Sequence, residues 1–159
     1  MHSTNSFVQA VNEYCAWAEA RPEDSVTEAR TALRLLVRLY GDALPLEPPP
    51  EVDYELNGTS LSQKEWTTFF KRFGALPFTY YGVACDPHLD APEEPGVGDL
   101  ADDLADIYRD LNEGLALERA GHHAEAIHNW WFSFRHHWGN HATSAIHALH
   151  TWFEKEAAW

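Results

Sequence analysis

The chain has little positive charge and little cysteine, and both shortages narrow what it can be. Lys and Arg total 11 against 25 Asp and Glu, which gives a formal net charge of -14 over 159 residues. A surface this negative repels phosphate backbones and anionic lipid headgroups, so we expect no nucleic-acid partner and no membrane partner. The two cysteines, Cys15 and Cys85, lie far apart without a CxxC spacing, so the sequence indicates no disulfide framework.

Long apolar runs are also missing. No stretch approaches the ~20 apolar residues of a membrane span, and the first residues lack the pattern of a signal peptide. We therefore expect a soluble, cytoplasmic protein. Hydrophobic residues nevertheless make up 45% of the chain and include seven Trp, which is typical of a packed core. The length predicts a single domain over residues 1–159, as a monomer or small homo-oligomer.

The apolar spacing predicts helices over most of the chain. Residues 5–20 and 25–41 repeat apolar side chains three and four apart, and Ser25-Val-Thr-Glu28 and Ser62-Gln-Lys-Glu65 have the capping-box pattern. Residues 42–61 and 75–98 are expected to be irregular connections, the second ending in an exposed acidic loop.

Residues 98–149 contain the longest helical pattern. Asp99 is the expected N-cap of a helix whose apolar face holds Leu100, Leu104, Ile107, Leu111 and Leu115. Gly121 predicts a left-handed turn, after which a second helix continues through Gly139. The predicted fold is all-α: a single-domain helical bundle of about five helices around this central antiparallel helical hairpin.

The first helix of this hairpin carries a stripe of carboxylates at Asp102, Asp103, Asp106 and Asp110. Carboxylates on one side of a helix can hold Mg²⁺ or Mn²⁺. They can also form ion pairs with Arg109, with Arg135 or with an arginine edge at positions 30, 34 and 38, or simply face solvent. The sequence leaves all three interpretations open.

The second helix contains most of the histidines. Eight of the ten lie between His122 and His150, and His137 and His141 are four residues apart, so they share one helix face. Antiparallel packing brings them toward Asp103 or Asp106, which gives either a buried Asp–His network or a mixed metal site. No HExxH, GxSxG or P-loop motif is present, and Cys85 with His88 is only a weak nucleophile signal.

Two functions follow from these residues. The leading one is a non-catalytic binding module without a cofactor, whose partner is an unknown protein or small molecule. Its candidate binding residues share the central hairpin: Asp102, Asp103, Asp106, Arg109, Asp110, His137, Trp138 and His141. The alternative is a metal-dependent hydrolase acting on a phosphorylated, nucleotide-type small molecule. There a divalent Mg, Mn or Zn ion is held by Asp103, Asp106, Asp110, His137 and His141, with an arginine on the phosphate.

Two long strings in this region carry a family resemblance. GDLADDLADIYRDL, with the later FSFRHHWGNHATSAIHALH, resembles a family of small bacterial proteins of unknown function, the DUF5063 type, mainly over Gly98–Trp152. The resemblance implies a helical, bacterial, cytosolic protein. It implies no activity and no site residues.

Overall fold

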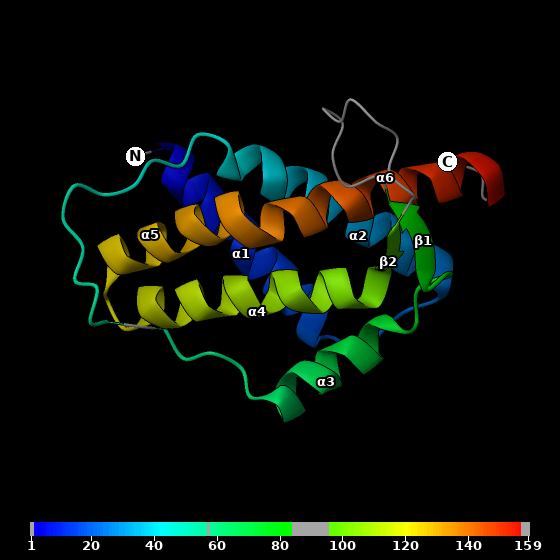
Figure 1. Ribbon diagram of the computed structural model, residues 1–159, viewed down its shortest axis with the longest axis horizontal. Coiled ribbons are helices and arrows are strands. Elements are labelled where there is room, and N and C mark those ends of the chain that lie inside the picture. The colour runs from blue at the N-terminus through cyan, green and yellow to red at the C-terminus, as the bar shows by residue number, and fades with distance from the viewer. Residues whose placement is uncertain (1, 57, 84–95, 157–159) are drawn as a thin grey trace.

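Helices dominate the computed structural model, which describes residues 2–56, 58–83 and 96–156 (Figure 1). In chain order the elements are α1 (His2–Glu19), α2 (Ser25–Ala43), α3 (Gln63–Phe73), β1 (Tyr80–Val83), β2 (Gly96–Asp99), α4 (Leu100–Arg119), α5 (His123–Ser133), the π-helix η1 (Phe134–Trp138) and α6 (Gly139–Glu156). Since α5, η1 and α6 follow one another without a break, the described residues form five helical rods. The predicted fold class is confirmed, with a small sheet added. None of the described helices combines the length and the apolar character needed to cross a membrane.

The rods of the central hairpin, α4 and α5–η1–α6, run antiparallel along the length of the molecule (Figure 1). Asp99 caps α4 as predicted, because its side chain accepts hydrogen bonds from the amides of Ala101 and Asp102. Gly121 makes the predicted turn with a φ of 86°, a conformation that glycine adopts without steric cost.

A second glycine lets these rods approach closely. A Cβ atom added at Gly114 of α4 would lie 2.2 Å from Nε1 of Trp130, so the indole packs directly on the α4 backbone. The same Nε1 donates a hydrogen bond to the carbonyl of Leu111 at 3.0 Å. This contact fixes the spacing and register of α4 against α5.

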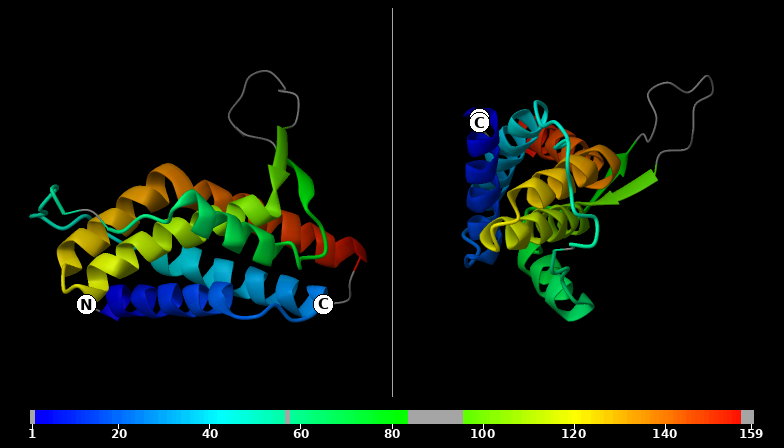
Figure 2. Two further views of the ribbon diagram at one scale, coloured as in Figure 1. Left: turned by 90° about the horizontal axis from the view of Figure 1, so that it is seen from below. Right: turned by 90° about the vertical axis from the view of Figure 1, so that its left-hand side faces the viewer.

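The core lies between the central hairpin and the pair α1–α2, and α3 packs on α4 from another side (Figure 2, right). All five apolar positions predicted for α4 are buried. The largest fully buried side chains come from every rod: Phe7, Tyr14, Leu36, Leu39, Phe73, Leu104, Ile107, Leu111, Trp130, Trp138 and Phe153.

The expectation of irregular chain over residues 75–98 is wrong at both described ends. Tyr80–Val83 and Gly96–Asp99 pair as an antiparallel two-stranded sheet that stands away from the helical body (Figure 2, left). The amide of Leu100 also donates to the carbonyl of Thr79 at 2.9 Å, which ties β1 to the start of α4. Residues 84–95, which contain Cys85, His88 and most of the predicted acidic loop, lie outside the described residues.

One of the two predicted capping boxes is correct. Ser62 and Glu65 form a reciprocal box at the start of α3. The box predicted for Ser25 and Glu28 is wrong, because Asp24 is the N-cap and Glu28 turns inward instead.

Glu28 is a buried carboxylate that joins three elements. Arg72 of α3 pairs with it at 2.5 Å, Trp17 of α1 donates its indole N–H at 3.2 Å, and the amide of Glu23 donates at 2.9 Å. A buried carboxylate must be paired, so Glu28 bonds to these donors instead of forming the local capping box with Ser25.

Candidate metal centre

The carboxylates of the site lie on the face of α4 that is turned toward η1 and α6. Asp103, Asp106 and Asp110 are three and four residues apart, a spacing that places side chains on one side of a helix. Asp103 is buried, and the side chains of Asp106 and Asp110 are only 14% and 13% exposed. They are therefore not a solvated stripe.

The imidazoles come from the π-helix and the start of α6. The amide of Gly139 donates to the carbonyl of Phe134, five residues earlier, and a Cβ at Gly139 would lie 2.3 Å from that oxygen. Glycine therefore permits this π-turn, a feature that is frequent at functional sites. His137 and His141 flank Gly139, with their ring centroids 4.8 Å apart.

Each imidazole is held by its own carboxylate. His137 Nδ1 lies 2.6 Å from Asp110 Oδ2, and His141 Nδ1 lies 2.7 Å from Asp103 Oδ1. An ionised carboxylate only accepts hydrogen bonds, so Nδ1 carries the proton in both rings and Nε2 of a neutral ring is a free lone pair. Metal-binding histidines are commonly held in this way, with one ring nitrogen donating to a carboxylate and the other directed at the ion.

The two Nε2 atoms face the same carboxylate oxygen. Asp106 Oδ2 is 3.6 Å from Nε2 of His137 and 3.7 Å from Nε2 of His141, and ligand atoms of the three residues lie within 4.8 Å of one another. These separations are too long for hydrogen bonds. A metal ion about 2.1 Å from each of two ligand atoms, at a tetrahedral angle, holds those atoms about 3.4 Å apart. The two gaps to Asp106 Oδ2 are close to that value, whereas the three ligand atoms together lie within 4.8 Å, so a bound ion would draw the imidazoles closer together.

The other oxygen of Asp106 is fixed by two donors. The indole N–H of Trp66 on α3 donates to Oδ1 at 2.8 Å, and Nη2 of Arg109 lies 3.1 Å from the same atom. Arg109 also approaches Asp110 at 3.7 Å. With Oδ1 engaged, the Asp106 carboxylate is oriented with Oδ2 toward the imidazoles.

Tyr81 of β1 supplies a further hydrogen-bond donor to the site. Its hydroxyl donates to Asp103 Oδ2, on the opposite side of that carboxylate from His141. Burial, followed by the contact with Asp103, raises the pKa of the Tyr81 hydroxyl, which keeps it protonated as a donor.

Several ionisable groups of the site have shifted pKa values. Burial raises the pKa of Asp110 and of Asp102, and in Asp102 the neighbouring Asp106 adds to the shift. The hydrogen bond to Asp103 raises the pKa of His141 although burial opposes it, so a proton and a cation compete for Nε2 of that ring. The cluster contains four carboxylates and one guanidinium, so its formal charge is negative when both imidazoles are neutral.

The family described as a domain of unknown function, DUF5063, matches residues 1–154. The chain belongs to the DUF5063 family. The match extends the resemblance seen over Gly98–Trp152 to nearly the whole sequence.

One solved structure is similar to this DUF5063 chain over its full length. It is the crystal structure of protein BF1032 from Bacteroides fragilis, with a TM-score of 0.79 and 19% sequence identity, over 99% of this chain and 96% of that one. At this identity the likeness shows the fold alone. Among curated proteins, no match is found.

The structure of the DUF5063 chain brings six of the eight predicted binding residues together: Asp103, Asp106, Arg109, Asp110, His137 and His141. Asp102 lies at the margin, close enough to Asp106 and His141 for their charges to act on it. Trp138 does not join them. It is fully buried in the core against Phe7 and Phe134, because the helix turns its side chain away from both histidines.

Sequence reasoning missed Trp66 and Tyr81. No local sequence pattern marks an indole or a phenol as a hydrogen-bond donor to a carboxylate, so nothing in the sequence singled them out. The predicted arginine edge of α2 is also not part of the site: Arg38 pairs with Glu13 and Asp42 instead.

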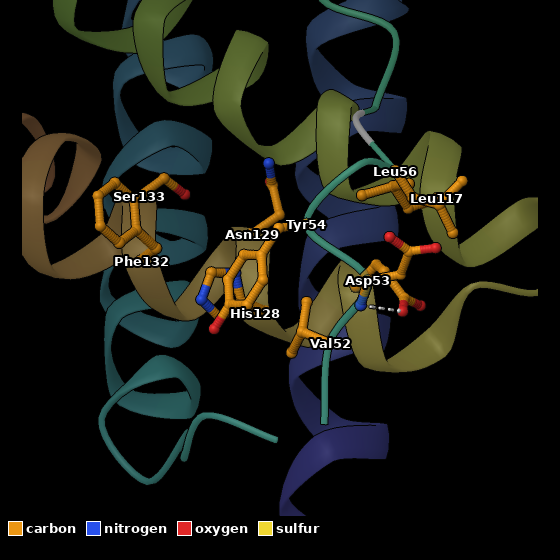
Figure 3. A pocket seen from close by; sticks show the side chains of 10 residues that line it. Val52, Asp53, Tyr54, Leu56, Leu117, His128, Asn129, Phe132 and Ser133 are labelled. Atoms are coloured by element: carbon orange, nitrogen blue, oxygen red, sulfur yellow. Dashed lines mark hydrogen bonds between the residues drawn. The ribbon is translucent and has the colours of Figure 1, made fainter. Parts of the chain in front are cut away.

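A separate hollow lies where the chain before α3 passes over α5 (Figure 3). It has a volume of about 200 Å³. The ring of Tyr54 stands perpendicular to that of His128, and the amide of Asp53 donates to Glu125 at 3.1 Å. None of the predicted site residues lines this hollow.

Proposed function

We propose that this protein binds a divalent first-row transition-metal ion through Nε2 of His137, Nε2 of His141 and Oδ2 of Asp106. One observation carries the proposal. Two imidazole Nε2 atoms lie 3.6 and 3.7 Å from one carboxylate oxygen, all three ligand atoms lie within 4.8 Å of one another, and each histidine is oriented by a separate carboxylate.

The ligand set favours some metals over others. Imidazole suits Zn²⁺, Fe²⁺, Co²⁺ and Ni²⁺, whereas Mg²⁺ and Ca²⁺ prefer oxygen ligands. Asp103 and Asp110 orient the histidines instead of coordinating the ion, so the metal set proposed here is smaller than the five residues expected from sequence. The protein is then a binding module whose ligand is a metal ion and whose Asp–His network is the outer shell of the site.

A metal-dependent hydrolase is the second candidate. Three protein ligands leave a coordination position for water, as in catalytic zinc sites, and the side chain of His137 is 39% exposed, which gives solvent access. A phosphorylated substrate is less well supported. Arg109 already contacts Asp106 and Asp110, and the surrounding carboxylates repel phosphate.

The test is metal binding by chelator-treated protein. We expect one equivalent of Zn²⁺ or Co²⁺ in a calorimetric titration, and at a hundred times Kd a stabilisation of about 2.7 kcal/mol. For a chain of this length that corresponds to a rise in Tm of roughly 8 °C. His137→Gln should abolish tight binding. The matched control is His136→Gln, which changes an exposed neighbour.

The outcomes separate the proposal from adventitious histidine binding. If no first-row ion binds to the wild type, or if His136→Gln weakens binding as much as His137→Gln, the proposed site is wrong. Hydrolase activity is tested separately, by assaying the metal-loaded protein on phosphate esters. We also expect a cytoplasmic location, which a free buried thiol at Cys15 suits, and a monomer or small homo-oligomer.

A further inference from the structure

Tyr81 connects the two-stranded sheet to a proposed metal ligand. Its hydroxyl donates to one oxygen of Asp103, and the other oxygen of Asp103 takes the Nδ1 proton of His141 at 2.7 Å. Ser144 of α6 lies close enough to the Tyr81 hydroxyl to lower its pKa, against the larger effect of burial. The phenol therefore fixes the rotamer of the carboxylate that orients the His141 ring.

The sheet is built so that this phenol can reach Asp103. Tyr81 lies directly opposite Gly98 in the strand register, and a Cβ at Gly98 would lie 2.4 Å from Cζ of Tyr81. The ring thus lies across the bare backbone of β2. Any side chain at position 98 would displace it.

The same short segment also places the carboxylate. β2 ends at Asp99, the N-cap of α4, and Asp103 stands one turn into that helix. Gly98 and Asp103 are only five residues apart across this strand-to-helix junction, so the backbone on which the phenol lies leads directly into the helix turn that carries its acceptor.

We propose that Tyr81 is a positioning residue for metal binding, that it acts on His141 through Asp103, and that Gly98 is required because it leaves room for the phenol. This inference rests on the metal site proposed above. Tyr81 does not touch the ion.

The adjacent residue provides a matched control. Tyr80 lies on the same strand, but successive residues of a strand point to opposite faces, and Tyr80 is 70% exposed. Tyr80→Phe and Tyr81→Phe each remove one hydroxyl from one strand of one hairpin. Only the second removes a donor to Asp103.

The experiment titrates Co²⁺ into chelator-treated wild type, Tyr81→Phe, Tyr80→Phe and Gly98→Ala, and follows the visible absorption of the bound ion. Loss of an outer-shell partner typically weakens metal binding 10–100-fold, so we expect Kd to rise about tenfold for Tyr81→Phe. The Co²⁺ spectrum should also change, since the His141 ring loses its fixed orientation. Gly98→Ala should reproduce both effects although the hydroxyl remains.

The controls make each result interpretable. Circular dichroism and urea denaturation of the metal-free proteins report folding separately from the Co²⁺ spectrum. If the wild type binds Co²⁺ and Tyr81→Phe gives the same Kd and spectrum, the positioning role is wrong and the metal site stands. An equal effect of Tyr80→Phe also overturns it. If the wild type binds no metal, the proposed function and this inference both fail.

Discussion

The glycine at the contact between α4 and α5 gives a prediction of unusual sign. In a helix, alanine is favoured over glycine by about 1 kcal/mol, so Gly→Ala normally stabilises. At Gly114 we expect the opposite, because the new methyl group would lie 2.2 Å from Nε1 of Trp130 and 2.5 Å from its Cε2. Trp130 is fully buried and has nowhere to move.

The magnitude follows from three contributions. Overpacking a core typically costs about 1–3 kcal/mol, and displacing the indole loses its hydrogen bond to Leu111, about 1 kcal/mol. Helix propensity offsets about 1 kcal/mol of this. Gly114→Ala should therefore lower the free energy of unfolding by roughly 1–3 kcal/mol, or Tm by roughly 3–9 °C.

The assay is urea and thermal denaturation followed by circular dichroism, with Gly41→Ala as the control. Gly41 is also helical, but a Cβ there meets nothing within 4 Å, so its replacement should stabilise by up to about 1 kcal/mol. If Gly114→Ala is as stable as the wild type, Trp130 does not set the spacing of the two rods.

Three further predictions concern the site, the core and the thiol. Asp106→Asn should abolish tight metal binding yet change the Tm of the metal-free protein little, because the amide oxygen still accepts the hydrogen bonds that Oδ1 accepts. If the free energy of unfolding instead falls by about 1–3 kcal/mol while metal binding is kept, the network is purely structural. Arg72→Met should cost about 3–5 kcal/mol in urea denaturation by leaving Glu28 buried and unpaired, and adding Glu28→Gln should recover part of it. Burial raises the pKa of Cys15 to about 12, so in a Cys85→Ser background the native thiol should resist iodoacetamide at pH 8 and react only in urea, as mass spectrometry will show.

The sequence predicts a helix well where the residues that determine it lie within a few positions of one another. The apolar face of α4, the cap at Asp99 and the turn at Gly121 are all local, and each is confirmed. The sheet was missed because its four-residue strands are too short to show alternation and are far apart in sequence. Glu28 fits the local box pattern, but its partner Arg72 lies 44 residues away.

The candidate site is likewise predictable only as far as local sequence patterns determine it. Spacing alone places Asp103, Asp106 and Asp110 on one helix face and His137 with His141 on another. Which carboxylate meets which imidazole depends on the register between the rods, and that register is set by the tertiary contact at Gly114. No pattern within either helix contains this information, so the pairs could be named only as alternatives.

The π-turn between α5 and α6 makes the candidate centre depend on backbone geometry as well as on side chains. A π-turn holds one residue more than a turn of regular helix, so it absorbs an extra residue and leaves α6 in phase with α5. If the same residues closed instead as an ordinary α-helix, everything downstream would rotate by about 100° and shift by about 1.5 Å. His141 would then swing away from Asp103 while the core contacts of α5 stayed in place. A Cβ atom at Gly139 would lie 2.3 Å from the carbonyl oxygen of Phe134, so a substitution there that removes the wide turn would separate the two imidazoles without altering any proposed ligand.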